Sequence, residues 1–210
     1  MSKVLALNSS ALGSASVSNQ LVQDALAQLR ARDPALEVTV RDLGTDPVPH
    51  LNTDSATALR GAGPANDAQA AAEALSNRLI AELKAADTIV IGAPMYNFGI
   101  PSTLKAWFDY VLRPGITFRY TEAGPIGLLE GKRAIVIESR GGYYSDGAAK
   151  ALDLQEPHLK ALLGFMGIKD ATFIRAEKLA FGPEARQQAL DRALTQLGQL
   201  LTENQYMRAA

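Results

Sequence analysis

The sequence predicts a doubly wound α/β fold, in which a parallel sheet of five strands lies between two layers of helices. Five short apolar runs recur along the chain, segments with the 3.6-residue period of helices separate them, and three of the runs are apolar throughout. With 210 residues and 47% hydrophobic content, the chain is long enough for one buried core and short for two. We therefore expect a single domain over residues 1–210.

The five apolar runs are the expected strands, and their polarity predicts where each lies in the sheet. The first, third and fourth runs are apolar on both faces, as strands buried between two helical layers are. The second run, EVTVRDL, alternates apolar and polar residues, and the fifth, ATFIRA, is also more polar, so both are expected at edges. The order that satisfies these expectations is 2-1-3-4-5. The runs span residues 4–7, 37–43, 88–91, 134–137 and 171–174.

Apolar residues at helical spacing mark the segments between the strands. One stripe follows the first strand and another lies near the end of the chain. Strands and helices that alternate at this spacing favour right-handed crossovers within a parallel sheet. The two stripes are Val17, Leu21, Val22, Ala25, Leu26 and Leu29, and Leu190, Ala193, Leu194, Leu197 and Leu201.

Two segments lack this regularity. Residues 53–74 are rich in alanine, glycine and polar residues, which favours a flexible surface loop that runs into the next helix. Residues 113–130 contain two prolines and three glycines and are expected to be an insertion before the fourth strand. Structured connections of this length are more often functional than short ones.

Composition and charge exclude several classes of function. The chain has no cysteine, which rules out disulfides and thiolate chemistry and suits a reducing compartment. A net charge of −1 gives no electrostatic reason to expect nucleic acid or an anionic membrane as partner. The first apolar run is too short for a signal peptide or a membrane span, so we expect a cytoplasmic protein. The two histidines, His50 and His158, show no metal-site spacing, and no metal is expected.

The strand order predicts where a ligand binds. In such sheets ligands lie outside the carboxyl ends of the strands, where the order reverses, here between the first and third strands. The loops expected to build the site are therefore residues 8–18, 92–101 and 139–146.

The first of these loops, NSSALGSASVS, is suited to an anion. Its hydroxyls and the amide groups of a helix that begins near Ser16 or Val17 could cradle a phosphate. A serine-rich turn with an ordinary helix N-cap explains the same residues equally well. The phosphate-binding motif G-x-x-x-x-G-K-[ST] and the dinucleotide motif G-x-G-x-x-G are both absent.

The second and third loops are suited to a flat ring. Residues 95–98, MYNF, lie between two prolines, Gly99 permits unusual dihedral angles, and Ser102 can cap the following helix. Aromatic side chains and the Asn97 amide suit a heteroaromatic ring, although an aromatic turn that packs in the core is the alternative. Gly141 and Gly142 could present amides to a developing negative charge, or form a simple turn. A phosphate end and a planar apolar end in one crevice together describe flavin mononucleotide, FMN.

Over essentially its whole length, the chain resembles the FMN-dependent NADH-azoreductases, which belong to the flavodoxin-like NAD(P)H:quinone oxidoreductases. The resemblance rests on NSSALGSASVS at 8–18, PMYNFGIPSTLKAWFDYVLRPGITF at 94–118, YTEAGPIGLLEGK at 120–132 and SRGGYY at 139–144. It implies the flavodoxin-like form of the fold and a homodimer with one FMN in each subunit, near the dimer interface. The cofactor-binding residues that it implies are Ser10, Ser16, Val17, Ser18, Met95, Tyr96, Asn97, Phe98, Ser139, Arg140, Gly141 and Gly142.

The resemblance also implies the reaction. NADH or NADPH would give a hydride to flavin N5 and leave, and a quinone or azo compound would then take two electrons. The flavin performs this chemistry, so no catalytic side chain is expected. Residues 117–125 would cover the ring, and Tyr120 and Tyr144 would line the substrate pocket; packing is the favoured role of such tyrosines, and proton donation the other.

Two other functions remain open at this point. A flavodoxin-type electron carrier would bind FMN but dock on proteins, which usually requires a strongly acidic face that a net charge of −1 does not favour. A flavin-free binding or regulatory module would be colourless.

Overall fold

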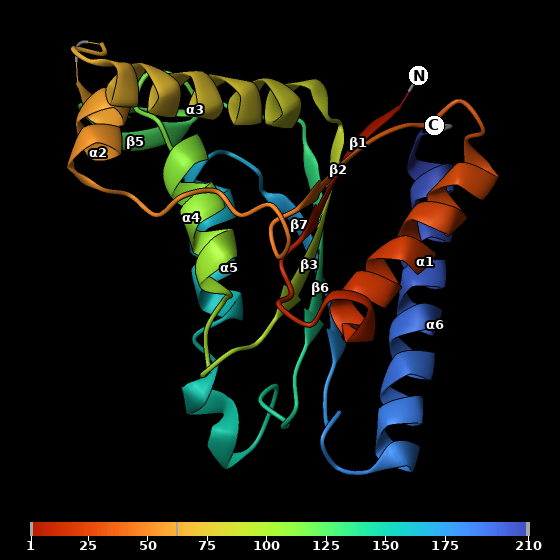
Figure 1. The fold of residues 1–210 in the computed structure, drawn as a ribbon. Coiled ribbons are helices and arrows are strands. Elements are labelled where there is room, and N and C mark those ends of the chain that lie inside the picture. The colour runs from red at the N-terminus through yellow and green to blue at the C-terminus, as the bar shows by residue number, and fades with distance from the viewer. Residues whose placement is uncertain (1, 62, 209–210) are drawn as a thin grey trace.

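The computed structural model describes residues 2–61 and 63–208, and these form three layers (Figure 1). A five-stranded parallel sheet lies between helices on both of its faces, which confirms the predicted fold class. The sheet strands are β1 (Lys3–Asn8), β2 (Glu37–Asp42), β3 (Thr88–Pro94), β6 (Arg133–Ser139) and β7 (Asp170–Ala176). The helices are α1 (Val17–Arg32), α2 (Thr53–Arg60), α3 (Asp67–Ala85), α4 (Ser102–Val111), α5 (Glu156–Phe165) and α6 (Pro183–Arg208).

The strand order in the sheet is β2-β1-β3-β6-β7, with every neighbouring pair parallel. The two more polar strands, β2 and β7, lie at the edges as their composition predicts. The expected order, 2-1-3-4-5, numbered only the five strands of the sheet, whereas the structure has seven strands along the described chain. Two short strands that the sequence did not predict, β4 (Phe118–Thr121) and β5 (Gly124–Gly127), come before the last two sheet strands and pair only with each other.

The sheet has a hydrophobic core on each face, because successive strand residues point to opposite sides. Leu5 and Leu7 of β1 face the layer of α3, α4 and α5, whereas Val4 and Ala6 face α1 and α6. The two helical layers are visible on either side of the sheet in Figure 1. All seven residues of β3 are buried, as a central strand requires.

Residues 53–74 differ from the expectation of a flexible loop. Residues 53–60 form helix α2, which begins with a capping box in which the Asn52 side chain accepts from the Ser55 N–H. Asp54 Oδ1 accepts from the Asn66 and Gln69 side chains, so α2 is tied to the start of α3. Asparagine and serine at the correct spacing are the local signal for this helix, which the alanine and glycine content obscured.

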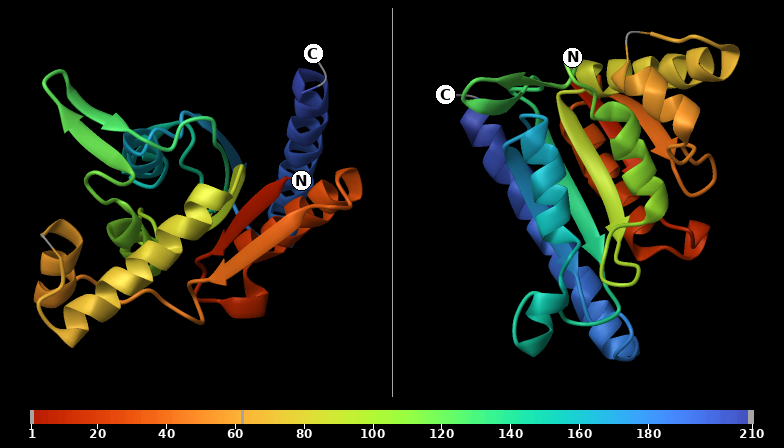
Figure 2. Two further views of the ribbon diagram at one scale, coloured as in Figure 1. Left: turned by 90° about the horizontal axis from the view of Figure 1, so that it is seen from above. Right: turned by 90° about the vertical axis from the view of Figure 1, so that its left-hand side faces the viewer.

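The insertion at residues 113–130 contains the β4–β5 hairpin. Because α4 runs antiparallel to β3, the chain has returned to the amino ends of the sheet strands when the hairpin begins. The hairpin extends away from the sheet there (Figure 2). It rests on the turn after α5, where a Cβ on Gly127 would lie only 2.0 Å from Gly167 N, and the Phe118 and Phe165 rings are 4.5 Å apart. The hairpin and the carboxyl-end loops therefore lie at opposite ends of the subunit.

Candidate functional site

The loops after β1, β3 and β6 meet at the carboxyl edge of the sheet, as the sequence predicts. Asn8 pairs with Gly92 at the end of β1, and Pro94 pairs with Ser139 at the end of β3. The Met95 N–H then donates to the Ser139 carbonyl at 2.9 Å. This register brings the starts of all three loops together, although they are more than forty residues apart along the chain.

The serine loop ends in a helix start whose donors are free. Ser16 is the N-cap of α1, and its Oγ accepts from Asn19 N–H at 3.2 Å, as expected for a capping serine. Among the described residues, the N–H groups of Val17 and Ser18 have no acceptor. The Ser16 and Ser18 hydroxyls lie 3.1 Å apart beside them. Two free amides, two hydroxyls and the positive end of a helix form a site for an anion.

A glycine allows this helix start to approach the sheet. A Cβ on Gly92 would lie 3.0 Å from Val22 Cγ2 and 3.4 Å from the Ser18 carbonyl oxygen. The Ser9 hydroxyl donates to the Gly92 carbonyl at 2.6 Å. A larger residue at position 92 would therefore crowd the first turns of α1.

The loop after β3 forms a tight two-residue turn. Tyr96 and Gly99 exchange backbone hydrogen bonds of 3.0 and 3.1 Å, which leaves Asn97 and Phe98 as the two central residues. Both have left-handed φ angles, 48° and 71° respectively, whereas Gly99, the expected site of unusual dihedrals, does not. Asparagine tolerates this conformation and phenylalanine does not, so the turn holds Phe98 under strain of about 1–2 kcal/mol. Strained aromatic residues on an exposed turn are typical of ligand sites.

The helix after this turn begins differently from the expectation. Pro101 occupies the N-cap position of α4, and Ser102 is the first helical residue without a side-chain capping bond. The proline stiffens the approach to the helix, because its φ is fixed.

The loop after β6 presents two free amides. The Gly141 carbonyl accepts from Ala180 N–H at 3.1 Å and the Gly142 carbonyl accepts from Lys178 N–H at 2.8 Å. Within the part of the chain that the structure describes, neither glycine N–H has an acceptor. With both carbonyls engaged on one side, the two N–H donors are left for a ligand on the other side. A Cβ on Gly142 would lie 2.8 Å from the Tyr144 ring, so a larger residue there would displace that ring.

The comparisons with known proteins agree with this geometry. Residues 2–201 match the family model described as flavodoxin-like fold. An FMN-dependent NADH:quinone oxidoreductase of Hyphomonas neptunium is 54% identical over 200 residues, covering 95% of this chain and 96% of that protein. One from Escherichia coli is 50% identical over 204 residues, covering 97% and 100%. The chain belongs to this family. The resemblance inferred from the sequence is thereby confirmed.

Solved structures of the same fold are close to this family member. A crystal structure of an FMN-dependent NADH-azoreductase from Bacillus anthracis, in complex with FMN, has 28% sequence identity and a TM-score of 0.85. It covers 95% of this chain and 99% of that chain. A second azoreductase structure from Bacillus anthracis has a TM-score of 0.88 at 26% identity.

The predicted cofactor-binding residues lie on the three loops at the carboxyl edge of the sheet, whereas Tyr120 does not and the Arg140 side chain points away from its loop. Tyr120 lies on the hairpin at the amino end of the sheet and is 71% exposed, so it does not line the pocket of its own chain. Residues 117–125 cannot cover a ring bound in the same chain, for the same reason. The Arg140 side chain is fully buried behind its loop, so only its backbone lies beside the crevice. Tyr144 does lie there, edge-on to Phe98 with ring centroids 6.2 Å apart.

Sequence reasoning missed the residues behind the Gly-Gly loop. Glu177 accepts from the Tyr144 N–H at 2.9 Å, and Gln155 donates to the Ala93 carbonyl at 2.8 Å. Neither residue belongs to a motif. The one sequence signal is indirect: Glu138 lies in an apolar strand where burial is expected, and a buried carboxylate needs polar partners from other segments.

Metal and membrane sites find no support. Within residues 2–61 and 63–208, no group of three or more His, Cys, Asp or Glu side chains could hold a metal ion. Across the same described residues, no helix combines the length and the apolar character needed to cross a membrane.

Proposed function

We propose that this protein is an FMN-dependent NADH:quinone oxidoreductase that also cleaves aromatic azo compounds reductively to amines. The observation that carries the proposal is the arrangement of unpaired donors at one sheet edge. Val17 and Ser18 offer free amides at one end of the crevice and Gly141 and Gly142 at the other, with the strained Asn97–Phe98 turn beside them.

The residues present fit FMN. A buried phosphate needs several N–H and O–H donors, which Ser10, Ser16, Val17 and Ser18 supply without a charged side chain. A flat ring needs apolar contact and donors along its polar edge, which residues 95–98 and 139–142 supply. The donor set therefore matches both ends of the cofactor.

When bound, FMN accepts a hydride and passes two electrons to the second substrate. The residues of this chain would bind the cofactor and orient its ring. The helix start at Ser16 would hold the phosphate, and the Gly141 and Gly142 N–H groups would donate to the polar edge of the ring and stabilise negative charge there. Phe98 and Tyr144 limit access of water to that edge. Tyr144 also lines the entry for the nicotinamide and for the quinone or azo compound.

The functional unit in this proposal is a homodimer. The hairpin exposes Tyr120, Ile126 and Leu128 at one end of the subunit, and Phe98 and Leu154 are exposed at the other. A symmetric dimer would place the hairpin of one copy against the crevice of its partner, which would return Tyr120 to a substrate pocket. Disrupting the hairpin with Gly127→Val is expected to reduce both dimerisation, measured by sedimentation, and turnover.

Two measurements test the proposed function. The purified protein, reconstituted with FMN, is expected to show the yellow absorption of bound flavin, which a flavin-free module would not. Anaerobic mixing with NADH is then expected to bleach that absorption on a catalytic timescale, and addition of a quinone to restore it. Bound flavin that NADH reduces only slowly would identify an electron carrier instead. A panel with NADPH and with azo dyes measures the preference for donor and acceptor.

A further inference from the structure

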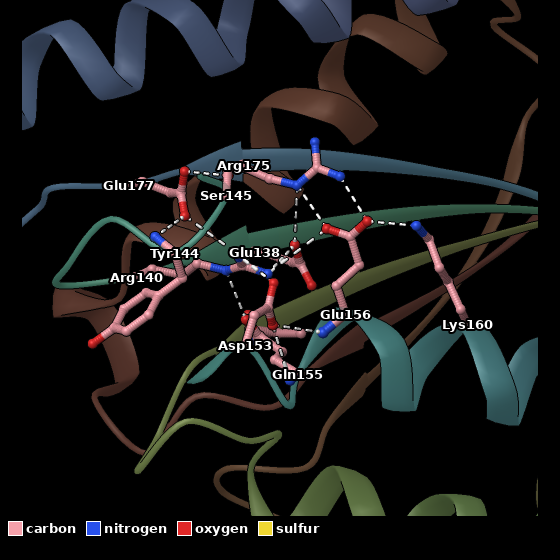
Figure 3. Close-up of polar contacts among 11 residues, drawn as sticks. Glu138, Arg140, Tyr144, Ser145, Asp153, Gln155, Glu156, Lys160, Arg175 and Glu177 are labelled. Carbon is pink, nitrogen blue, oxygen red and sulfur yellow. Dashed lines mark hydrogen bonds and ion pairs between the residues drawn. The ribbon is translucent and has the colours of Figure 1, made fainter. Parts of the chain in front are cut away.

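A cluster of buried charged side chains lies directly behind the loop after β6, with Arg140 at its centre (Figure 3). Arg140 Nη2 donates to Glu138 Oε2 at 2.7 Å, and Nη1 donates to Glu177 Oε1 at 3.1 Å and lies 3.0 Å from Asp153 Oδ2. Arg140 Nε donates to Gln155 Oε1 at 3.0 Å. All three nitrogens of the guanidinium group are therefore engaged. The Arg140 cluster is Glu138, Arg140, Asp153, Gln155, Glu156, Arg175 and Glu177.

Glu177 joins this cluster to the loop. Its Oε1 accepts from the Arg140 guanidinium and also from the Tyr144 N–H at 2.9 Å. Its Oε2 accepts from the Ser145 hydroxyl. Only 9% of Glu177 is exposed, so these bonds compete little with water. One carboxylate thus connects an immobile guanidinium to two successive residues of the loop.

The backbone completes the attachment. The Arg140 N–H donates to the Ala176 carbonyl at 2.9 Å, and its carbonyl accepts from Leu179 N–H at 3.2 Å. The segment that contains Glu177 therefore holds the loop on both sides of Arg140. The same segment also bonds the carbonyls of Gly141 and Gly142, which leaves the N–H groups of the two glycines as the donors without a partner among the described residues.

The cluster is close to electrically neutral. Burial raises the pKa of Glu138 to about 8, an effect that Arg140 and Arg175 oppose and that Glu156 and Asp153 reinforce. Among the described residues, Glu138 Oε1 has no hydrogen-bond partner. Burial thus favours the protonated form of Glu138, although its Oε2 accepts from Arg140. Besides Glu138, the cluster contains the carboxylates of Asp153, Glu156 and Glu177 and the cations of Arg140 and Arg175. Lys160, an exposed residue outside the cluster, pairs with Glu156 and supplies a third cation.

Resting on the proposed function, we propose that Glu177 is a positioning residue for flavin reduction. By binding Arg140 on one side and the Tyr144–Ser145 backbone and hydroxyl on the other, Glu177 fixes the Gly141 and Gly142 N–H donors against the polar edge of the ring. Because reduction adds negative charge there, fixed donors stabilise the reduced state more than the oxidised state. Glu177 thereby raises the reduction potential of the bound flavin.

The direction in which the flavin midpoint potential shifts in Glu177 variants distinguishes a positioning role of Glu177 from an effect of its charge. Glu177→Ala removes a negative charge, which by itself would favour the reduced flavin and shift its potential to more positive values. Loss of positioning shifts the potential the opposite way. We expect a more negative midpoint potential for Glu177→Ala in spectroelectrochemical titration. Glu177→Gln retains an acceptor for the Tyr144 N–H and is expected to stay at or above the wild-type potential.

Ser145→Ala provides a test without any change in charge, and it is expected to fold even if Glu177→Ala does not. It removes only the hydroxyl bond to Glu177, and we expect a smaller shift in the same negative direction. Asp170→Asn is the control, because it removes a carboxylate that pairs with Arg133 at the opposite ends of β6 and β7. Its potential is expected to equal that of the wild type.

The positioning can also be measured without flavin. In the FMN-free protein, hydrogen exchange of the peptide that covers residues 139–147 is expected to be faster in Glu177→Ala and Ser145→Ala than in Asp170→Asn. Unchanged exchange together with unchanged or more positive potentials would overturn the proposal. A wild-type protein that binds no FMN would instead remove the proposed function, while the exchange measurement would still report whether Glu177 holds the loop.

Discussion

Ser10 and Tyr96 join two of the loops that frame the crevice, with their hydroxyl oxygens 3.1 Å apart. The Ala11 N–H donates to the same tyrosine oxygen, also at 3.1 Å. One phenol from the loop after β3 thus fixes the serine loop after β1. The phosphate end and the ring end of the crevice are therefore mechanically connected, which no single loop motif indicates.

Removing this connection should weaken cofactor binding. Tyr96→Phe keeps the ring and deletes the oxygen, so the serine loop loses hydrogen bonds worth about 1 kcal/mol each. The two bonds together amount to about 2 kcal/mol, and since 1.4 kcal/mol corresponds to tenfold, we expect the Kd for FMN to rise by up to about thirtyfold. Quenching of flavin fluorescence on titration measures it. Tyr143→Phe is the matched control, because Tyr143 is exposed and stacks with Lys178 through its ring. Equal affinities for the two variants would contradict this role of Tyr96.

Asn97 offers a way to separate backbone strain from recognition. Asn97→Gly keeps the left-handed turn without strain and removes the amide, whereas Asn97→Ala removes the amide and leaves alanine in a conformation that asparagine tolerates better and that costs about 1–2 kcal/mol. Both variants are expected to lose FMN more readily than the wild type, and only the alanine variant should also melt at a lower temperature. His158→Ala, on α5 and outside the three loops, is expected to retain FMN. Full retention by Asn97→Gly would show that the amide does not contact the ring.

The sequence predicts the crevice well because its signals are local. Apolar runs mark the strands, and the residues that follow each run lie at the carboxyl edge in any parallel sheet. The place of Tyr120 could not be predicted in the same way, because it depends on where α4 ends and on how Gly127 packs against Gly167. Within one subunit this loop lies at the amino end of the sheet, and only in the proposed dimer would it reach a substrate pocket.

Arg140 shows a second kind of limit. A basic residue beside two glycines in a ligand loop is easily interpreted as a ligand-binding side chain. Its burial depends on three carboxylates from two other segments, Asp153 and Glu156 before and at the start of α5 and Glu177 after β7, and no local pattern reveals that they converge. In similar sequences, a charged residue within an apolar strand such as β6 indicates that oppositely charged partners from other segments are buried beside it.

The raised pKa of Glu138 predicts how stability depends on pH. Between about pH 4.5 and 8, the unfolded chain has released this proton and the folded chain keeps it, so the free energy of unfolding falls as pH rises. Below this window both states are protonated, and above it both are ionised. We expect Glu138→Gln to gain stability relative to the wild type between pH 5 and 9, measured by urea unfolding. Parallel pH profiles for the two proteins would disprove this.

Glu156 supplies the contrasting case within the same cluster. Burial alone would raise its pKa, but hydrogen bonds from Arg175 and Lys160 outweigh burial and lower the pKa to about 2. Its contribution to stability is therefore complete above about pH 4.5 and is lost as pH falls toward 2. Glu156→Gln is expected to differ from the wild type above pH 5 and to approach it in acid.

Arg140 itself should be essential for stability rather than for direct contact with the cofactor. Arg140→Met fills a similar volume but leaves buried carboxylates without their cation, which typically costs about 3–5 kcal/mol. The comparable change at the far end of β6, Arg133→Met, breaks an exposed pair with Asp170 and is expected to cost under about 1 kcal/mol. Urea unfolding of both variants at pH 7 measures the difference.

If Arg140→Met unfolds at the same urea concentration as Arg133→Met, the cluster does not depend on its central cation. In that case the carboxylates of Arg140→Met would be neutralised by protonation instead of by a cation. The free energy of unfolding of Arg140→Met would then change between pH 5 and pH 9, whereas that of Arg133→Met would not.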